Sequence, residues 1–187
     1  MQQSGEYLIK APRDAVWQAL NDPDVLARSI DGCESLTQLT DSSWQAAVKA
    51  RIGPVSATFN ADLEITDSQP PESYRLNASI KGGAAGHGKG TADVRLEETA
   101  DGTRLSYDVN GSVGGKLAQV GSRMVDGAVR KMGDDFFRRF SDIVAPGGAE
   151  RVPPAQPASR YESSGQGRIW IIVFGLLALA AALALLL

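Results

Sequence analysis

The chain has 187 residues, of which 43% are hydrophobic, and a formal net charge of −3 at pH 7. This length allows one ordinary domain with a sizeable core and some additional segments, and the slightly acidic balance argues against a nucleic-acid-binding protein, which needs a basic surface. Cys33 is the only cysteine, so an intrachain disulfide and a cysteine-based metal cluster are excluded. A reducing, cytoplasmic setting fits this composition.

The first 29 residues predict a strand followed by two short helices. Residues 4–10 have the pattern of a short strand. Pro12 suits the first turn of a helix, and a second short helix is expected at 24–29.

From Ser35 onward, apolar and polar residues alternate, which is the pattern of half-buried antiparallel strands. The clearest case is the segment 55–65, and Asp101-Gly102 predicts a hairpin turn between the last two strands. About seven strands are expected, at residues 4–10, 35–40, 44–52, 55–65, 74–80, 85–98 and 103–113.

Residues 116–144 contain no proline and predict one long helix of about 45 Å. One face carries an apolar stripe, and the other carries acid–base pairs four residues apart. The stripe consists of Leu117, Val120, Met124, Ala128, Met132, Phe136, Phe140 and Ile143. The pairs are Asp126/Arg130, Asp134/Arg138 and Asp135/Arg139.

The C-terminal part differs in composition from the domain expected at 1–145. Residues 146–167 are rich in proline, glycine and serine, which predicts a flexible linker. Residues 169–187 carry no charge, and a helix of this length would span about 28 Å, close to the hydrocarbon thickness of a bilayer. We therefore expect a transmembrane anchor at 168–187, with a hydrophobic docking helix as the alternative. The N-terminus lacks the apolar core of a signal peptide and Arg168 precedes the apolar run, so the domain is expected on the cytoplasmic side of the membrane.

The expected interior is rich in small residues. One side of the strand at 85–98 carries Gly86, Gly88, Gly90 and Ala92. Small side chains facing the helix leave space, and methionines adapt to variable contents, so we expect an apolar cavity between the long helix and the sheet. The alternative is that the glycines allow close helix–sheet contact. The expected lining residues are Phe59, Leu63, Leu76, Ile80, Tyr107, Val109, Leu117, Met124, Ala128 and Met132.

The order of the elements resembles the helix-grip fold of the START-like (SRPBCC) superfamily, also called Bet v 1-like. More closely, the segments SGEYLIKAPRDAVWQALNDPDVL, IDGCESL, RIGPVSATF, PPESYRL, GTADVRLEE, DGTRLSY and GGKLAQVGSRMVDG resemble the CoxG family of carbon monoxide dehydrogenase subunits. The similarity covers most of residues 1–144. The linker and the apolar tail also resemble the form of that family found beside molybdenum-type carbon monoxide dehydrogenases.

The resemblance implies an α+β domain in which a curved seven-stranded antiparallel sheet surrounds the long C-terminal helix. It also implies a function other than catalysis. Members are held to be accessory proteins that bind the dehydrogenase and tie it to the cytoplasmic membrane. The family is also linked to binding a respiratory quinone, here menaquinone rather than ubiquinone as the first expectation, so that electrons reach the membrane pool. No metal and no covalent cofactor are expected.

Two other functions remain open at this point. The first is a recruitment scaffold for the dehydrogenase that binds no small molecule. The second is a START-like enzyme, although the inward rows offer almost no acids or bases for catalysis.

Three single features have both a functional and a structural interpretation. The glycine-rich segment 82–90 lacks the following helix that a phosphate-binding loop needs, so a hairpin or cavity gate is favoured. His87, the only histidine, is expected to be a loop residue, with a quinone contact or a catalytic base as the weaker alternative. Tyr107 either donates to a quinone carbonyl or reaches solvent from the core.

Overall fold

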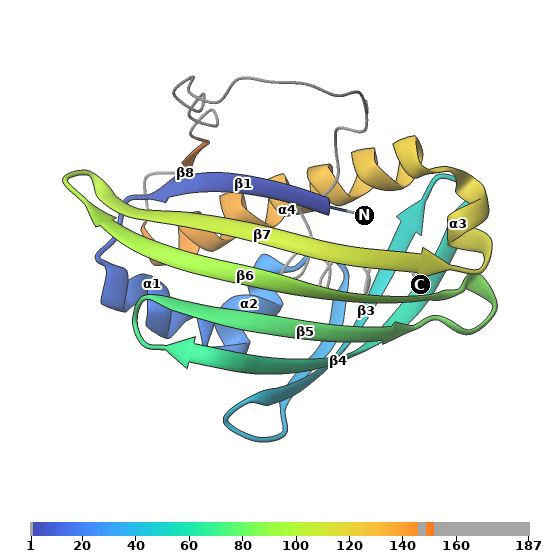
Figure 1. Ribbon diagram of the computed structural model, residues 1–187, viewed down its shortest axis with the longest axis horizontal. Coiled ribbons are helices and arrows are strands. Elements are labelled where there is room, and N and C mark those ends of the chain that lie inside the picture. Colours follow the sequence, from blue (N-terminus) through green and yellow to red (C-terminus); the bar gives the residue numbers. More distant parts are fainter. Residues whose placement is uncertain (1, 146–148, 152–187) are drawn as a thin grey trace, which may run out of the picture.

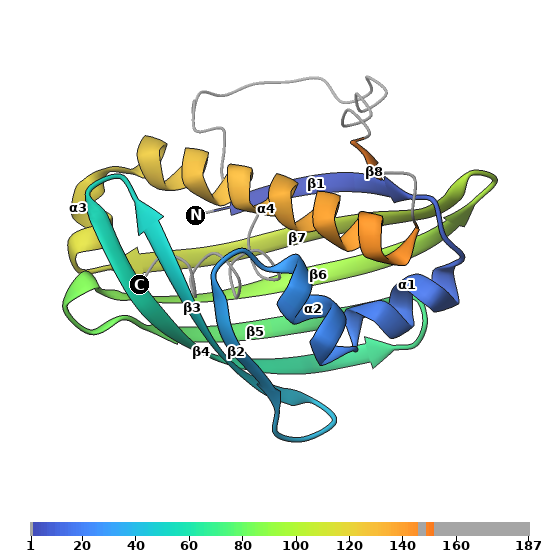
Figure 2. The same ribbon diagram turned by 180° about the vertical axis from the view of Figure 1, so that it is seen from behind.

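The computed structural model describes residues 2–145 and the backbone of residues 149–151, which form a strongly curved antiparallel sheet with a long helix on its concave side (Figures 1 and 2). The predicted anchor at 168–187 and most of the predicted linker lie outside the described residues. Within the described residues, no helix has the length and apolar character needed to cross a bilayer.

The sheet contains the seven predicted strands and one more. The strands are β1 (Gln2–Ile9), β2 (Cys33–Gln38), β3 (Ser43–Ile52), β4 (Val55–Gln69), β5 (Ser73–Lys81), β6 (His87–Thr99), β7 (Gly102–Gly114) and β8 (Ala149–Arg151). Their order in the sheet is β2-β3-β4-β5-β6-β7-β1-β8. The short strand β8 lies inside the segment predicted as a linker and pairs with β1 along Tyr7–Ile9.

The helices are α1 (Arg13–Leu20), α2 (Pro23–Ser29), α3 (Lys116–Val120) and α4 (Ser122–Val144), with a 3-10 turn η1 (Gly83–Ala85) before β6. The start of α2 is fixed by its N-cap, because the Asp22 side chain accepts hydrogen bonds from the backbone N–H groups of Asp24 and Val25. Pro23 occupies the first helical position, where the missing N–H has no cost.

The predicted single helix at 116–144 is wrong at one point. Gly121 has a φ of +96°, which only glycine adopts readily, and it divides the segment into α3 and α4. Figure 2 shows α3 at one end of the sheet and α4 crossing its concave face, with α1 and α2 near the C-terminal end of α4.

The buried face of α4 also differs from the predicted stripe. Val125, Val129 and Phe137 are buried, whereas Met124 is 50% exposed. The Met124 sulfur lies against Gly53 in the β3–β4 turn, where a Cβ would overlap it. Val125 and Val129 each follow a predicted stripe residue by one position, so the face of α4 that meets the sheet is rotated about the helix axis from the predicted stripe.

The charged pairs of α4 are also rearranged from the prediction. Asp135 pairs with Lys131 at 2.6 Å and with Arg138 at 2.8 Å. Arg139 reaches Asp31 beside α2 at 2.6 Å instead of Asp135.

Candidate functional site

The concave face of the sheet carries the predicted small residues in its centre. Strand register places Ala78 on β5 opposite Gly90 on β6, and Gly90 opposite Gly111 on β7. In the next row, Gly88 lies opposite Ile80. The alternation therefore predicted correctly that these small residues share the inward side of adjacent strands.

Aromatic rings fill the space between the C-terminal half of α4 and the sheet. The Phe137 ring stacks on Tyr7 with centroids 4.1 Å apart and lies 5.9 Å from Tyr107. Phe136 and Phe140 extend this cluster along the helix. This end of the predicted hollow is occupied by the chain's own side chains.

A small apolar space of about 30 Å³ lies elsewhere, between the α1–α2 pair and strands β2 to β5. We call it the inner cavity. Its lining residues are Leu20, Leu26, Ile30, Leu36, Trp44, Ala46, Leu63, Ile65, Tyr74 and Leu76. Leu63 and Leu76 are among the residues expected from the sequence.

Two residues that line the inner cavity each have a polar atom that is buried without a hydrogen-bond partner in the described part of the chain: the indole N–H of Trp44 and the hydroxyl of Tyr74. Each side chain is only 4% exposed. Burial raises the pKa of the Tyr74 hydroxyl, so it remains a protonated donor at every physiological pH. The Trp17 ring meets Tyr74 edge-on at a centroid distance of 5.6 Å.

A larger pocket of about 410 Å³, the outer pocket, opens between α2, α4 and the β3–β4 hairpin. Its lining residues are Ile30, Asp31, Lys49, Ala50, Arg51, Ser56, Ala128, Lys131, Met132, Asp135 and Phe136. Ala128 and Met132 were expected from the sequence. Ile30 lines both spaces, so it lies at the point where the outer pocket approaches the inner cavity.

Charged groups surround the apolar floor of the outer pocket. The carboxylate of Asp135 has its pKa lowered, chiefly by the hydrogen bond from Lys131 and also by that from Arg138. Lys49 and Arg51 contribute two further positive charges. An apolar molecule with a polar end could therefore lie with its apolar part against Ala128 and Met132.

The other expected lining residues have different positions. Phe59, Ile80, Tyr107, Val109 and Leu117 are buried in the core and line neither of these two spaces. Met124 is half exposed over Gly53, so its expected position inside the domain is wrong.

Sequence reasoning missed Ile30, Trp44 and Tyr74 as site residues. A signal for the two aromatic residues was present, since each occupies the inward side of an alternating strand and carries a polar atom. Nothing in the sequence indicated that α1 and α2, rather than α4, cover them.

The glycine-rich segment forms the β5–β6 connection with η1 and leads directly into β6, as expected for a hairpin. His87 is exposed at the start of β6, and its ring lies against Gly114. Cys33 is half-buried at the start of β2.

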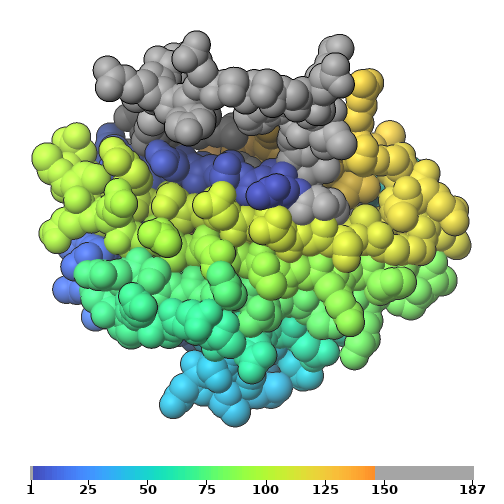
Figure 3. Space-filling view, viewed as in Figure 1, coloured from blue at the N-terminus to red at the C-terminus, as the bar shows by residue number. Residues whose placement is uncertain are grey.

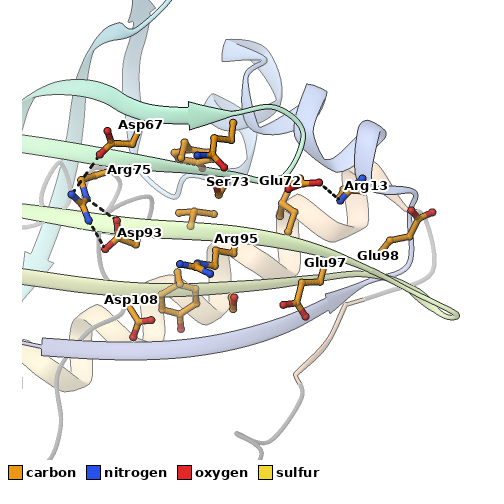
Figure 4. Close-up of a pocket in the computed structure, with 16 residues that line it drawn as sticks. Arg13, Asp67, Glu72, Ser73, Arg75, Asp93, Arg95, Glu97, Glu98 and Asp108 are labelled. Atoms are coloured by element: carbon orange, nitrogen blue, oxygen red, sulfur yellow. Dashed lines mark hydrogen bonds and ion pairs between the residues drawn. The ribbon is translucent and has the colours of Figure 1, made fainter.

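The opposite face of the sheet, which is turned toward the viewer in Figure 3, has a polar groove of about 820 Å³, and Figure 4 shows the residues that line it. Arg75 donates to both carboxylate oxygens of Asp93, at 2.7 and 3.1 Å, and lies 3.5 Å from Asp67. Arg13 and Glu72 form a further pair at 3.4 Å. These exposed ion pairs are typical of a solvated surface and provide no apolar surface on which a lipophilic ligand could bind.

Known protein families and solved structures that resemble this chain indicate its family and its fold. The family model that describes CoxG, a subunit of carbon monoxide dehydrogenase, matches residues 5–145. A conserved protein from Geobacillus kaustophilus has a similar crystal structure, with a TM-score of 0.72 and 30% identity over 79% of this chain and 97% of that chain. No curated protein matches the sequence.

More distant structures show the fold alone. A protein from Rhizobium leguminosarum has a TM-score of 0.60 at 15% identity, over 78% of this chain and 95% of that one. Ara h 8.0201 has a TM-score of 0.58 at 13% identity, over 79% of this chain and 99% of that one. The predicted helix-grip fold is confirmed.

Proposed function

The chain belongs to the CoxG family of carbon monoxide dehydrogenase subunits, and on this premise we propose that it is a non-catalytic accessory protein of a molybdenum carbon monoxide dehydrogenase. In this proposal it binds a respiratory quinone, menaquinone in the first instance, and carries or presents it between the membrane and the dehydrogenase. The apolar segment 168–187 anchors the chain in the cytoplasmic membrane, with the domain on the cytoplasmic side.

One observation carries the ligand part of the proposal: an apolar cavity lies next to a pocket that opens at the surface, and the two share Ile30. An isoprenoid chain exposed to water is unfavourable by about 25 cal/mol per Å² of apolar surface. An interior lined by aliphatic side chains would shield that surface during transfer.

Ligand binding requires the domain to open. A space of about 30 Å³ takes about one or two water molecules, which is much less than a quinone ring. The aromatic cluster holds the C-terminal half of α4 on β1 and β7, whereas α1 and α2 are short and carry most of the cavity's roof. We therefore assign the opening movement to the α1–α2 pair.

The test uses the full-length chain, purified in detergent from a quinone-producing host. Organic extraction and mass spectrometry of the extract should yield quinone in a fixed ratio to protein, and stripped protein should bind added menaquinone saturably. An empty chain that also shows no saturable binding would overturn the ligand part of the proposal. Co-purification with the dehydrogenase tests the partner separately.

The recruitment scaffold remains the second candidate, and the small volume of the inner cavity favours it. A chain that ends at residue 167 distinguishes the two functions. A scaffold would lose the membrane localisation of the dehydrogenase and show no quinone binding, whereas a carrier would lose localisation but still bind quinone in solution.

A further inference from the structure

The two unsatisfied donors of the inner cavity lie on either side of one strand. Trp44 on β3 pairs in register with Leu63 on β4, and Ile65 on β4 pairs with Leu76 on β5, two residues after Tyr74. Leu63 and Ile65 therefore form the floor between the two donors. Leu20, Leu26 and Ile30 cover this floor from the α1–α2 side.

The rest of the cavity lining cannot satisfy these donors. Its eight other residues are leucine, isoleucine and alanine, whose side chains have no acceptor. An indole N–H can only donate, and the buried phenol remains protonated. A buried donor without a partner is destabilising, and most buried polar groups in proteins have one, so two at a single apolar cavity require an explanation.

We infer that Trp44 and Tyr74 are the polar anchor of the ligand site, donating hydrogen bonds to carbonyl oxygen on an otherwise apolar ligand. This inference rests on the proposed function and adds the chemistry of recognition. Aliphatic side chains accept any apolar skeleton, whereas the two donors select molecules that carry acceptors. A quinone ring has both properties.

The anchor also discriminates between redox states. A quinone carbonyl only accepts hydrogen bonds, which matches two donors. A quinol hydroxyl must also donate, and among the lining side chains only the Tyr74 oxygen can accept. The oxidised ligand should therefore bind more tightly than the reduced one.

The test compares two probes that differ in their acceptors: menadione, with two carbonyl groups, and methylnaphthalene, with none. Equilibrium dialysis at fixed detergent concentration gives the affinity of the full-length chain and of the variants Trp44→Phe and Tyr74→Phe. Each variant should bind menadione about three- to tenfold more weakly, the effect of losing one hydrogen bond, and should bind methylnaphthalene as the wild type does. Trp17→Phe is the matched control, because Trp17 touches Tyr74 but does not line the cavity, and both affinities should stay unchanged.

The melting temperature of the ligand-free protein provides a second test. Tyr74→Phe removes only the hydroxyl, so the empty variant should melt at the wild-type temperature or above it. A lower melting temperature with unchanged menadione affinity would mean that the hydroxyl serves the fold through water or protein, and would overturn the anchor alone. Wild-type protein that binds neither probe would overturn the proposed function and the anchor with it.

Discussion

The hydroxyl of Tyr7 on β1 donates a 2.7 Å hydrogen bond to Oδ1 of Asp134 on α4, joining residues 127 positions apart in the chain. This bond lies beside the stacked rings of Tyr7 and Phe137. Together they fix the C-terminal half of α4 to one side of the sheet.

Replacing Tyr7 with Phe should lower the free energy of unfolding by about 1–3 kcal/mol, since a hydrogen bond to a part-buried carboxylate is lost while the ring is kept. Urea unfolding measures this change. Asp142→Asn, at an exposed position of the same helix, should change stability by less than about 0.5 kcal/mol. Equal effects of the two substitutions would show that the bond does not hold the helix.

The Asp135 cluster predicts a pH dependence. Lys131 and Arg138 hold the pKa of Asp135 below its ordinary value of 3.8, so the stabilisation is fully present above that value and is lost as the pH falls through the lowered pKa. Asp135→Asn should lower stability at pH 7 by up to about 1 kcal/mol, because the pairs are partly solvated. Urea midpoints at neutral pH and near pH 2 should show this difference shrinking in acid; a constant difference would contradict it.

The break between α3 and α4 predicts opposite effects for two glycine substitutions. A Cβ at Gly121 or at Gly127 would meet nothing within 4 Å, so only backbone conformation distinguishes them. Gly121→Ala should destabilise the fold by about 1 kcal/mol or more, because φ is +96° there. Gly127→Ala, within α4, should stabilise it by about 0.5–1 kcal/mol. Thermal unfolding of both variants checks the pair.

Ile30 lines both the outer pocket and the inner cavity, and this position predicts an effect of Ile30 on the association rate of the ligand. Ile30→Val removes one methylene between the outer pocket and the inner cavity, so menadione should associate faster in stopped-flow measurements. Ile52→Val is the control, since Ile52 is fully buried and lines neither space. Both variants should lose about 0.5–1.5 kcal/mol of stability, but the control should keep the wild-type rate. Equal association rates would place the access route elsewhere.

The donor pair predicts redox selectivity. Menadione should bind several-fold more tightly than its two-electron-reduced quinol under anaerobic conditions, and Trp44→Phe should reduce that ratio, because the indole N–H can only donate. Equal affinities of the wild-type chain for both forms would contradict the assignment of Trp44 and Tyr74 as carbonyl donors.

The strands were predictable because apolar and polar residues alternate along each strand that has one buried face. β4 was predicted to end at residue 65 but continues to Gln69, since Asp67 adopts a φ of +51° at an irregularity that alternation cannot represent. The break at Gly121 was missed because a glycine inside a helical pattern is compatible with both a helix and a break. Strand β8 is too short to have a pattern of its own.

The site was only partly predictable because it depends on which helices cover which part of the sheet. Inward-facing residues such as Leu63 and Leu76 follow from the period of a strand, and both line the inner cavity. The position of α1 and α2 over Trp44 and Tyr74 depends on tertiary packing, which no local pattern encodes. The sequence placed Met124 on the buried side of the helix, but it is half exposed over Gly53, because the orientation of α4 also depends on tertiary packing.

Pairing of β8 with β1 has a practical consequence for handling the domain. Residues 149–151 cover the outer edge of β1 along Tyr7–Ile9, an edge whose free backbone groups would otherwise recruit strands from other molecules. The opposite boundary of the sheet, β2, is short and irregular between Cys33 and Ser35, which discourages such association. A shortened chain that stops at residue 145 should therefore self-associate, whereas one that extends past Arg151 should stay monodisperse.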